Sequence, residues 1–378
     1  EYEYFELNGL DRNYSYSRIW ILNNLDYNTL MNNFIYLFKF CDHQMRICLV
    51  SKICELSTLE KIQMTSKYSY KIGIEYELKN DLSILQIKSY YFFLKHNNII
   101  FESIIEWFFK DYLFEEFGIR NFEFAPISHS LKYFEKCRTV LPEIDSVLKQ
   151  YNLYVEDNEI NPELLQLTSE HLLLKNVASL IPDKYVYSND SEEYIRIAYY
   201  MFSDQCLLCY IEGKDYHYNN FYELLNSENI NIEDYEEHRR YDINWLIENN
   251  YLIIENNVLK IVNIIRMNIF YDLYLNNVIS YHNCNESKKR EIDNLIELNI
   301  VRFESSLFSK PEQDYINFHL NKTFNNSLDI RNSYLHGTQP KNDQEGVHQR
   351  NYFIILKILV LIIIKINDDL CLKHSISE

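Results

Sequence analysis

The sequence predicts a mainly α-helical chain of two or three domains, and three observations support this fold class. The 378 residues include only 6 Gly and 6 Pro, which is few for an all-β chain with many turns. Hydrophobic residues make up 47% and charged residues 24%, a balance typical of folded globular domains. Apolar residues also recur at helical spacing over long stretches. We expect three parts, at residues 1–212, 213–265 and 266–378.

The N-terminal part, 1–212, is predicted to be multi-helical, and its role is open between a sensor, an inhibitor and a platform for a partner. Residues 1–20 show no clear period, whereas 68–78 alternate as a strand or an extended connector would. The first expected helix, at 26–40, carries an apolar face formed by Leu30, Phe34, Leu37 and Phe38. The other expected helices are 45–60, 82–95, 99–117, 128–150, 163–180 and 191–209, with a surface loop at 152–163.

The middle part, 213–265, combines two short helical patterns with two strands. The helices are expected at 221–225 and 232–249, and an Asn-rich turn at 255–257 separates an apolar run from a second strand at 258–262. This order resembles the helix-and-wing end of a winged-helix domain, a fold that often binds DNA. The presumed reading helix, however, carries Glu233, Asp234, Glu236 and Glu237 against Arg239 and Arg240. That balance opposes phosphate binding, so we interpret the part as a packing or protein-contact module.

The C-terminal part, 266–378, is predicted to be a four-helix bundle with helices at 266–281, 287–298, 313–336 and 348–370. Residues 353–366 are apolar except for Lys357 and Lys365. Fourteen residues with two lysines are too short to span a bilayer comfortably, so we expect this segment to be the central helix of the bundle.

A compact polar motif lies at the end of the third predicted helix of this bundle, before the connection to the fourth. It reads Arg331-Asn332-Ser333-Tyr334-Leu335-His336 and is followed by Gly337 and Pro340, which should end the helix. His336 would then lie in a last helical turn, where the macrodipole favours its protonated form. A His that exchanges protons near neutral pH, beside an Arg and an Asn, suits an RNA phosphate.

At these residues the sequence resembles the HEPN superfamily of helical nucleases, whose hallmark is Arg, a polar residue, three variable residues and His. The resemblance implies an endoribonuclease that needs no metal and no other cofactor, and that pairs two HEPN domains, as a homodimer or with another HEPN chain. It implies a prokaryotic toxin or abortive-infection effector of anti-phage defence. The implied catalytic residues are Arg331, His336 and Asn332. The candidate substrate contacts are Tyr334, which could instead fill the core, His319, Lys322 and Lys341.

Other interpretations of the motif remain open. Five helical steps of about 100° place Arg331 and His336 roughly 140° apart, so one straight helix does not aim both at one phosphate. Arg331 could instead pair with Asp329 or Asp343, while His336 caps the last carbonyls. The chain would then be a non-catalytic HEPN adaptor. A third possibility is a winged-helix regulator that binds DNA, which the acidic helix at 232–249 disfavours.

The net charge of −18 argues against stable binding to long duplex DNA. Residues 310–378, however, hold eight Lys or Arg and eight Asp or Glu, so the excess of acid lies before the motif. A local positive cleft for a transient RNA substrate is therefore possible. Its candidate residues are Lys322, Arg331, His336, Lys341, His348 and Arg350.

The eight Cys are scattered, and no signal peptide is evident, which predicts a reduced, cytoplasmic setting. Cys206 and Cys209 have metal-ligand spacing but no second pair, so we expect buried helix cysteines rather than zinc ligands. No Walker loop, dinucleotide glycine fingerprint or zinc-protease helix is present. We therefore expect no metal, no cofactor and no membrane partner.

Overall fold

The computed structural model describes residues 3–8, 11–64, 66–161, 163, 165, 172–215, 217–335 and 344–377. The chain divides into two compact units. Unit 1 combines Glu1–Pro182 with Ser305–Glu378, and unit 2 is Asp183–Glu304. Helices dominate the described residues of both units, so the predicted fold class, mainly α, is confirmed.

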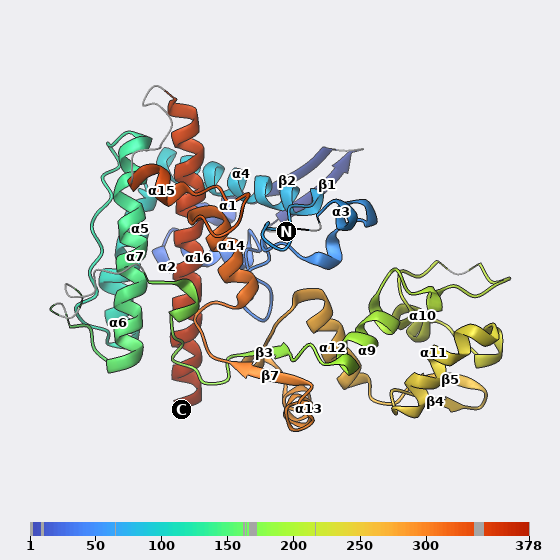
Figure 1. The fold of residues 1–378 in the computed structure, drawn as a ribbon. Helices are drawn as coiled ribbons and strands as arrows, with labels where there is room; N and C mark the ends of the chain where they lie inside the picture. The colour runs from blue at the N-terminus through green and yellow to red at the C-terminus, as the bar shows by residue number, and fades with distance from the viewer. Residues whose placement is uncertain are drawn as a thin grey trace. The chain divides into compact units, whose positions relative to one another are not determined.

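Unit 1 is built around one long helix, α16 (Glu345–Ser377), beside which α7 (Tyr133–Asp157) runs in Figure 1. Every residue of α16 from 352 to 366 is buried, including both lysines, as expected for a central helix. A third long helix, α4 (Ile74–His96), also packs on α16. The other elements of unit 1 are β1 (Glu3–Asn8), β2 (Asp11–Tyr16), α1 (Arg18–Leu22), α2 (Tyr27–Tyr36), η1 (Ile53–Glu55), α3 (Thr58–Gln63), α5 (Phe101–Trp107), the π-helical turn η2 (Phe108–Tyr112), α6 (Leu113–Phe117), η3 (Leu174–Asn176), α14 (Lys310–Leu320) and α15 (Ile330–Leu335).

A buried carboxylate ties four helices of unit 1 together. Glu102 on α5 accepts hydrogen bonds from Tyr91 on α4 (2.8 Å), Tyr352 on α16 (2.8 Å) and Lys136 on α7 (2.5 Å). Both charged side chains are at most 3% exposed. Because the ion pair is buried and further hydrogen-bonded, removing either partner would leave an uncompensated buried charge. This network fixes how the helices around α16 are placed.

The N-terminal helices match the predictions in part. The expected helix at 26–40 appears as α2 with its apolar face buried, and 99–117 is the continuous run α5–η2–α6, which Gly118 ends in the left-handed conformation. Residues 128–150 lie largely in α7, which extends to Asp157, so the expected loop at 152–163 begins only after it. Residues 68–73 are not helical, and α4 starts at Ile74.

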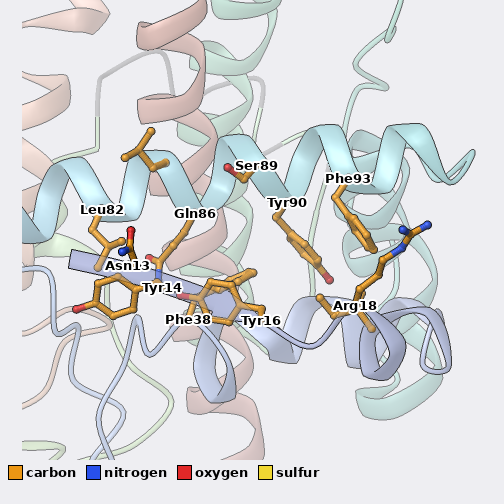
Figure 2. A pocket seen from close by; sticks show the side chains of 12 residues that line it. Asn13, Tyr14, Tyr16, Arg18, Phe38, Leu82, Gln86, Ser89, Tyr90 and Phe93 are labelled. Carbon is orange, nitrogen blue, oxygen red and sulfur yellow. Dashed lines mark hydrogen bonds between the residues drawn. The ribbon is translucent and has the colours of Figure 1, made fainter. Parts of the chain in front are cut away.

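The sequence did not predict two features of this region. Residues 1–20 contain an antiparallel hairpin, β1–β2, in which Glu3 pairs with Tyr16. The hairpin and α1 lie over α4, with a pocket between them (Figure 2). The expected helix at 45–60 is mostly a loop, because the Asp42 carboxylate accepts the backbone N–H groups of Gln44 and Arg46 and so competes with helix formation. Of the expected helix at 163–180, residues 172–180 contain only η3, and most of the rest lie outside the described residues.

Unit 2 contains helices, a hairpin and a three-stranded antiparallel sheet with the order β6–β3–β7. The middle part of the sequence prediction is confirmed at the level of elements: the helices at 221–225 and 232–249 appear as α10 and as η5 with α11, and β4 and β5 form the hairpin. Asn256 and Asn257 at its turn both have positive φ, which asparagine tolerates. The elements are β3 (Tyr185–Ser188), α9 (Glu192–Phe202), η4 (Leu207–Cys209), α10 (Phe221–Ser227), η5 (Ile232–Asp234), α11 (Glu237–Glu248), β4 (Leu252–Glu255), β5 (Val258–Ile261), α12 (Ile264–Asn276), β6 (Ile279–Ser280), η6 (Tyr281–Asn283), α13 (Glu286–Glu297) and β7 (Val301–Glu304).

The four helices predicted for 266–378 are divided between the units. The helices at 266–281 and 287–298 exist as α12 and α13, but they pack in the core of unit 2. The helices after residue 304 pack in unit 1. The sequence boundaries after residues 212 and 265 therefore do not coincide with the unit boundaries after residues 182 and 304. Local patterns located the helices but carried no information about which hydrophobic faces meet.

The predicted single helix at 313–336 is two helices, α14 and α15. An Asn-rich segment separates them, and the side chain of Asn326 exchanges two 2.9 Å hydrogen bonds with the backbone of Tyr70. Asp329 has φ +51°, which ends any continuous helix before α15. Among the described helices, none is both long and apolar enough to cross a membrane.

Candidate functional site

The first half of the motif lies on α15, a six-residue helix in unit 1. Ile330 and Tyr334 are buried in the core, and α15 contacts α7 and α14. Asp329 fixes the start of the helix, because its carboxylate accepts from Asn332 Nδ2 (2.7 Å) and its carbonyl accepts from Ser333 Oγ (2.9 Å). Asn332 is half-buried and so remains partly accessible.

Arg331 forms an ion pair with Asp145 on α7. The Arg331 side chain is 9% exposed and that of Asp145 is 24% exposed. Burial lowers the pKa of Arg331, while the Asp145 charge opposes that change. The interpretation of Arg331 as a structural residue expected Asp329 or Asp343 as its partner. Asp329 instead accepts a hydrogen bond from Asn332, and Asp343 lies outside the described residues.

Tyr334 joins α15 to the start of α16. Its hydroxyl lies 2.7 Å from Nδ1 of His348 and accepts from Asn351 Nδ2 at 3.1 Å. Tyr334 and His348 are both at most 1% exposed, and burial raises the pKa of Tyr334. The Tyr334 hydroxyl thus connects α15 to α16 through both His348 and Asn351. Tyr334 therefore fills the core in this structure and does not present a face for stacking on a base.

His336 and Lys341 lie outside the described residues. His336 directly follows Leu335, the last residue of α15, and Lys341 belongs to the same connection to α16. Lys322 is exposed on the segment between α14 and α15. The structure thus places Arg331, Asn332 and Tyr334 on one helix, with the position of Lys322 compatible with contact to a ligand.

His319 is not accessible to a substrate. It is fully buried on α14, with Nδ1 2.9 Å from the Tyr315 carbonyl oxygen and Nε2 3.4 Å from Asn80 Oδ1. Burial, with a contribution from Lys357, lowers the pKa of His319 to about 3. The side chain is neutral at physiological pH, so the sequence-based assignment to RNA contact does not fit this geometry.

Asn80 also accepts from Lys357 Nζ at 2.9 Å, and Lys357 donates to Ser83 Oγ at 3.1 Å. Lys357 is fully buried on α16 and forms no ion pair within the part of the chain that the structure describes. Burial lowers its pKa to about 7, against the attraction of Asp81. This cluster of His319, Asn80, Ser83 and Lys357 is closed to solvent at both basic groups, so it is a core network rather than a binding site.

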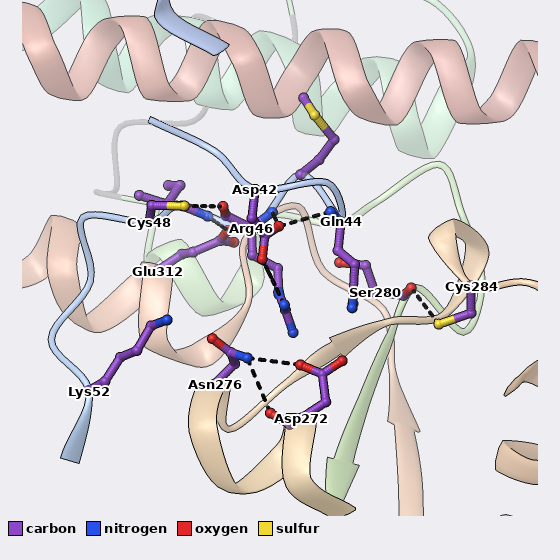
Figure 3. Close-up of polar contacts among 12 residues, drawn as sticks. Asp42, Gln44, Arg46, Cys48, Lys52, Asp272, Asn276, Ser280, Cys284 and Glu312 are labelled. Atoms are coloured by element: carbon purple, nitrogen blue, oxygen red, sulfur yellow. Dashed lines mark hydrogen bonds and ion pairs between the residues drawn. The ribbon is translucent and has the colours of Figure 1, made fainter. Parts of the chain in front are cut away.

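The second lysine of α16 has a different environment. Lys365 Nζ lies 3.2 Å from Glu312 Oε1 on α14 and donates to the Met45 carbonyl at 2.9 Å. Glu312 also accepts from the backbone N–H of Ile47 at 2.9 Å, in the loop that follows Asp42 (Figure 3). The Glu312 charge and the other nearby acids outweigh burial and raise the pKa of Lys365. This ion pair attaches the loop to α14 and α16.

Among the described residues, no group of three or more His, Cys, Asp or Glu side chains is arranged to hold a metal ion. Cys206 is buried and Cys209 is half-buried, at the ends of the short 3₁₀ turn η4 rather than within α9. Burial raises the pKa of Cys206 to about 11, which keeps the thiol protonated and a poor ligand.

Sequence reasoning missed the residues that surround the motif. Asp145 lies 186 positions before Arg331, in a helix that carries no motif, so no local signal could have paired them. Asn351 was also not identified from the sequence as a residue near the motif. His348 was included only as one member of a positive cleft, whereas its ring is buried against Phe134 with centroids 5.2 Å apart.

Comparisons with protein-family models, curated proteins and solved structures found no match. A function for this chain therefore has to be argued from its own residues and their arrangement.

Proposed function

We propose that this chain is a metal-independent endoribonuclease of the HEPN type, and a toxin or abortive-infection effector in anti-phage defence. The observation that carries the proposal is the position of Arg331 and Asn332. They lie on a separate short helix that leads directly into His336 and then to the long helix α16. A fixed guanidinium, an amide and an imidazole within six residues are the groups that internal cleavage of RNA requires.

In the proposed reaction, the ribose 2′-oxygen attacks the adjacent phosphorus and displaces the 5′-oxygen of the next nucleotide. The 2′-hydroxyl loses its proton and the leaving oxygen gains one, with His336 acting as the base or the acid. Arg331 stabilises the negative charge that develops on the phosphoryl oxygens, and Asn332 orients the substrate or the imidazole. The products are a 2′,3′-cyclic phosphate and a 5′-hydroxyl.

The ion pair with Asp145 is compatible with this role. A guanidinium carries five N–H donors, so Arg331 can keep a carboxylate on one edge and receive a phosphate on another. Asp145, which is partly exposed, would then be a positioning residue that holds the fork in one orientation. Lys322 and Lys341 are proposed as contacts to the RNA backbone.

We further propose that two copies of the chain, or this chain and another HEPN chain, pair so that both motifs line one cleft. The motivation comes from the sequence: if residues 331–336 formed one helix, Arg331 and His336 would point about 140° apart. A second motif would supply the group that a single copy cannot aim at the same phosphate.

A non-catalytic adaptor is the second candidate, and one observation favours it. Arg331 is buried and paired with a carboxylate of its own chain, which is also what a purely structural arginine would show. A DNA-binding regulator receives less support. Unit 2 contains the helices and the hairpin from which the sequence suggested a winged helix. Both arginines of α11, however, bind backbone carbonyls of the same unit: Arg239 those of Leu207 and Tyr210, and Arg240 those of Glu233 and Tyr235.

The decisive experiment incubates purified protein with total RNA in EDTA and maps the ends of the products. We expect cleavage that is equal in EDTA and in magnesium, with 2′,3′-cyclic phosphate ends. His336→Ala should abolish cleavage without unfolding the protein, and Arg331→Lys should retain part of it, because Lys keeps the charge but lacks the bidentate fork. His374→Ala, at an exposed site near the end of α16, is the matched control. Cleavage by His336→Ala at the wild-type rate, or its loss in EDTA, would exclude the mechanism.

A further inference from the structure

A pocket of about 500 Å³ lies in unit 1 between α4 on one side and β2 with α1 on the other (Figure 2). This volume falls within the range of roughly 300–1,000 Å³ typical of small-molecule sites. The pocket is separate from the motif on α15 in its lining residues and is not used by the proposed reaction. Its residues are Asn13, Tyr14, Tyr16, Arg18, Ile21, Phe38, Leu82, Leu85, Gln86, Ser89, Tyr90 and Phe93.

The walls of the pocket are rich in aromatic rings. Tyr90 and Phe93 extend from α4 into the space, and Tyr14 and Tyr16 extend from β2 (Figure 2). Phe38 packs edge-on against both Tyr16 and Tyr90, with ring centroids 5.0 Å apart in each pair. Flat rings on facing walls favour a flat ligand, because stacking needs only a π-face and tolerates different rings.

Hydrogen bonds hold these walls in place before any ligand binds. Gln86 Nε2 donates to the Tyr16 hydroxyl at 2.5 Å, which connects α4 to β2 across the pocket. The Tyr90 hydroxyl accepts from Asn33 Nδ2 at 2.9 Å and donates to the Leu30 carbonyl at 3.2 Å. The rings therefore remain in position without a ligand, which lowers the cost of ordering them on binding.

The charge of the lining contrasts with the charge of the protein. The described residues that line the pocket include one cation, Arg18, and no carboxylate, although the whole chain has a net charge of −18. Arg18 is exposed, and in Figure 2 its side chain extends toward the end of the pocket marked by Phe93. Glu3, the acid that contributes to the raised pKa of Tyr16, is paired with Lys39. An anionic group at the Arg18 end would thus meet a guanidinium and no lining acid.

We propose that this pocket binds a free nucleoside monophosphate, with the base between the aromatic walls and the phosphate on Arg18. Asn13 and Ser89 supply polar groups that can meet the edge of a base or a sugar hydroxyl. An uncharged aromatic ligand would make no ion pair with Arg18, and inorganic phosphate would make no stacking contact with the rings. The combination selects a ligand that is flat at one end and anionic at the other. This site gives the N-terminal region a ligand-binding role that does not depend on RNA cleavage.

The test is titration calorimetry of the full chain with AMP, UMP, adenosine and inorganic phosphate. AMP or UMP should bind with one site per chain, adenosine more weakly, and phosphate least of all. Arg18→Ala should weaken the binding of the nucleotide by about tenfold. It should change the affinity for adenosine by no more than about twofold, because only the phosphate contacts the guanidinium. Ser89→Trp, at an exposed position on α4, should fill the pocket and remove binding of both nucleotide and nucleoside.

Lys95→Ala is the matched control, since it removes one positive charge from an exposed site on the same helix that does not line the pocket. It should bind AMP as the wild type does. If neither AMP nor UMP binds at about 1 mM, or if Ser89→Trp binds normally while its circular dichroism is unchanged, the proposal is wrong. If Arg18→Ala and Lys95→Ala weakened the binding of AMP equally, the attraction would be a general effect of charge, and the proposal would also be wrong.

Discussion

At the scale of single residues, Arg331 shows how a motif residue and a structural residue can be the same. It is the motif residue that we propose to meet a phosphate, yet its guanidinium pairs with Asp145 and is nearly buried. Arg331→Ala is therefore a poor test of catalysis by itself, because it changes both chemistry and stability. Arg331→Lys, which retains a cation for Asp145, separates the two effects better.

We predict that Arg331→Ala and Asp145→Ala each lower the free energy of unfolding by about 1–3 kcal/mol. This is less than the cost of breaking a fully buried pair, because Asp145 is partly exposed. The double variant should lose less than the sum of the two, since each single variant leaves the other charge without its main partner. Denaturation in urea measures all three. Strict additivity would mean that the ion pair contributes little.

The two buried lysines of α16 allow a matched comparison of pH dependence. Burial holds the pKa of Lys357 at about 7, below its ordinary value of 10.5. Between these values the unfolded chain binds more protons than the folded one, so the free energy of unfolding rises as pH increases from about 7 to 10.5. Lys357→Met should reduce this rise, measured by urea denaturation at several pH values.

Lys365→Met is the counterpart on the same helix, and it should destabilise the protein because it breaks a buried ion pair. Its partner Glu312 would remain buried at 1% exposure without its cation. The free energy of unfolding should therefore fall by about 3–5 kcal/mol at neutral pH. If both substitutions destabilised the protein equally at pH 7, the distinction between an unpaired and a paired lysine would be incorrect.

At the scale of elements, the sequence predicts what depends on local pattern. The apolar run within α16 and the helix α2 follow from side-chain periodicity, and the β4–β5 hairpin follows from its Asn-rich turn. The β1–β2 hairpin was missed because its strands show no regular alternation. The break between α14 and α15 depends on hydrogen bonds from Asn326 to Tyr70, 256 residues away, which no local pattern contains.

We predict that Asn326→Ala lowers the free energy of unfolding by about 1–3 kcal/mol, because it removes two hydrogen bonds and leaves backbone groups of Tyr70 without partners. Asn325→Ala is the control, because the hydrogen bond that Asn325 makes within the described part of the chain comes from its backbone N–H, to the Tyr68 carbonyl. The change should also weaken RNA cleavage, because the segment leads to α15. Thermal denaturation with equal melting temperatures for the two variants would contradict this prediction.

For α11 we predict that the full chain binds duplex DNA no more tightly than about micromolar, even at about 50 mM salt, where non-specific binding is favoured. The reason is that Arg239 and Arg240 already donate to carbonyls of unit 2, beside acidic residues of the same helix. Fluorescence anisotropy with a labelled duplex is the measurement. Tighter binding, reduced by Arg239→Ala, would restore the DNA-binding regulator as a candidate.

At the scale of the whole molecule, the two ends of the chain build one unit and the middle builds another. The motif and its contacts consequently come from three separate stretches: Asp145 from α7, Arg331 and Tyr334 from α15, and His348 from α16. The sequence located Arg331 and His336 as candidates because their spacing is local. It could not locate Asp145, because long-range packing decides which acid lies beside the guanidinium.

The proposed pairing of two copies makes a quantitative prediction about cleavage. Specific activity should rise with protein concentration and reach a plateau once light scattering shows a dimer, because mass action controls how many complete clefts exist. Mixing wild-type protein with an equal amount of His336→Ala should reduce activity per wild-type chain to about half, because half of the wild-type chains then pair with an inactive motif. An equal amount of serum albumin is the control. Full activity per chain in the mixture, or in a protein that remains monomeric, would mean that one copy positions both Arg331 and His336, and the proposed pairing would be wrong.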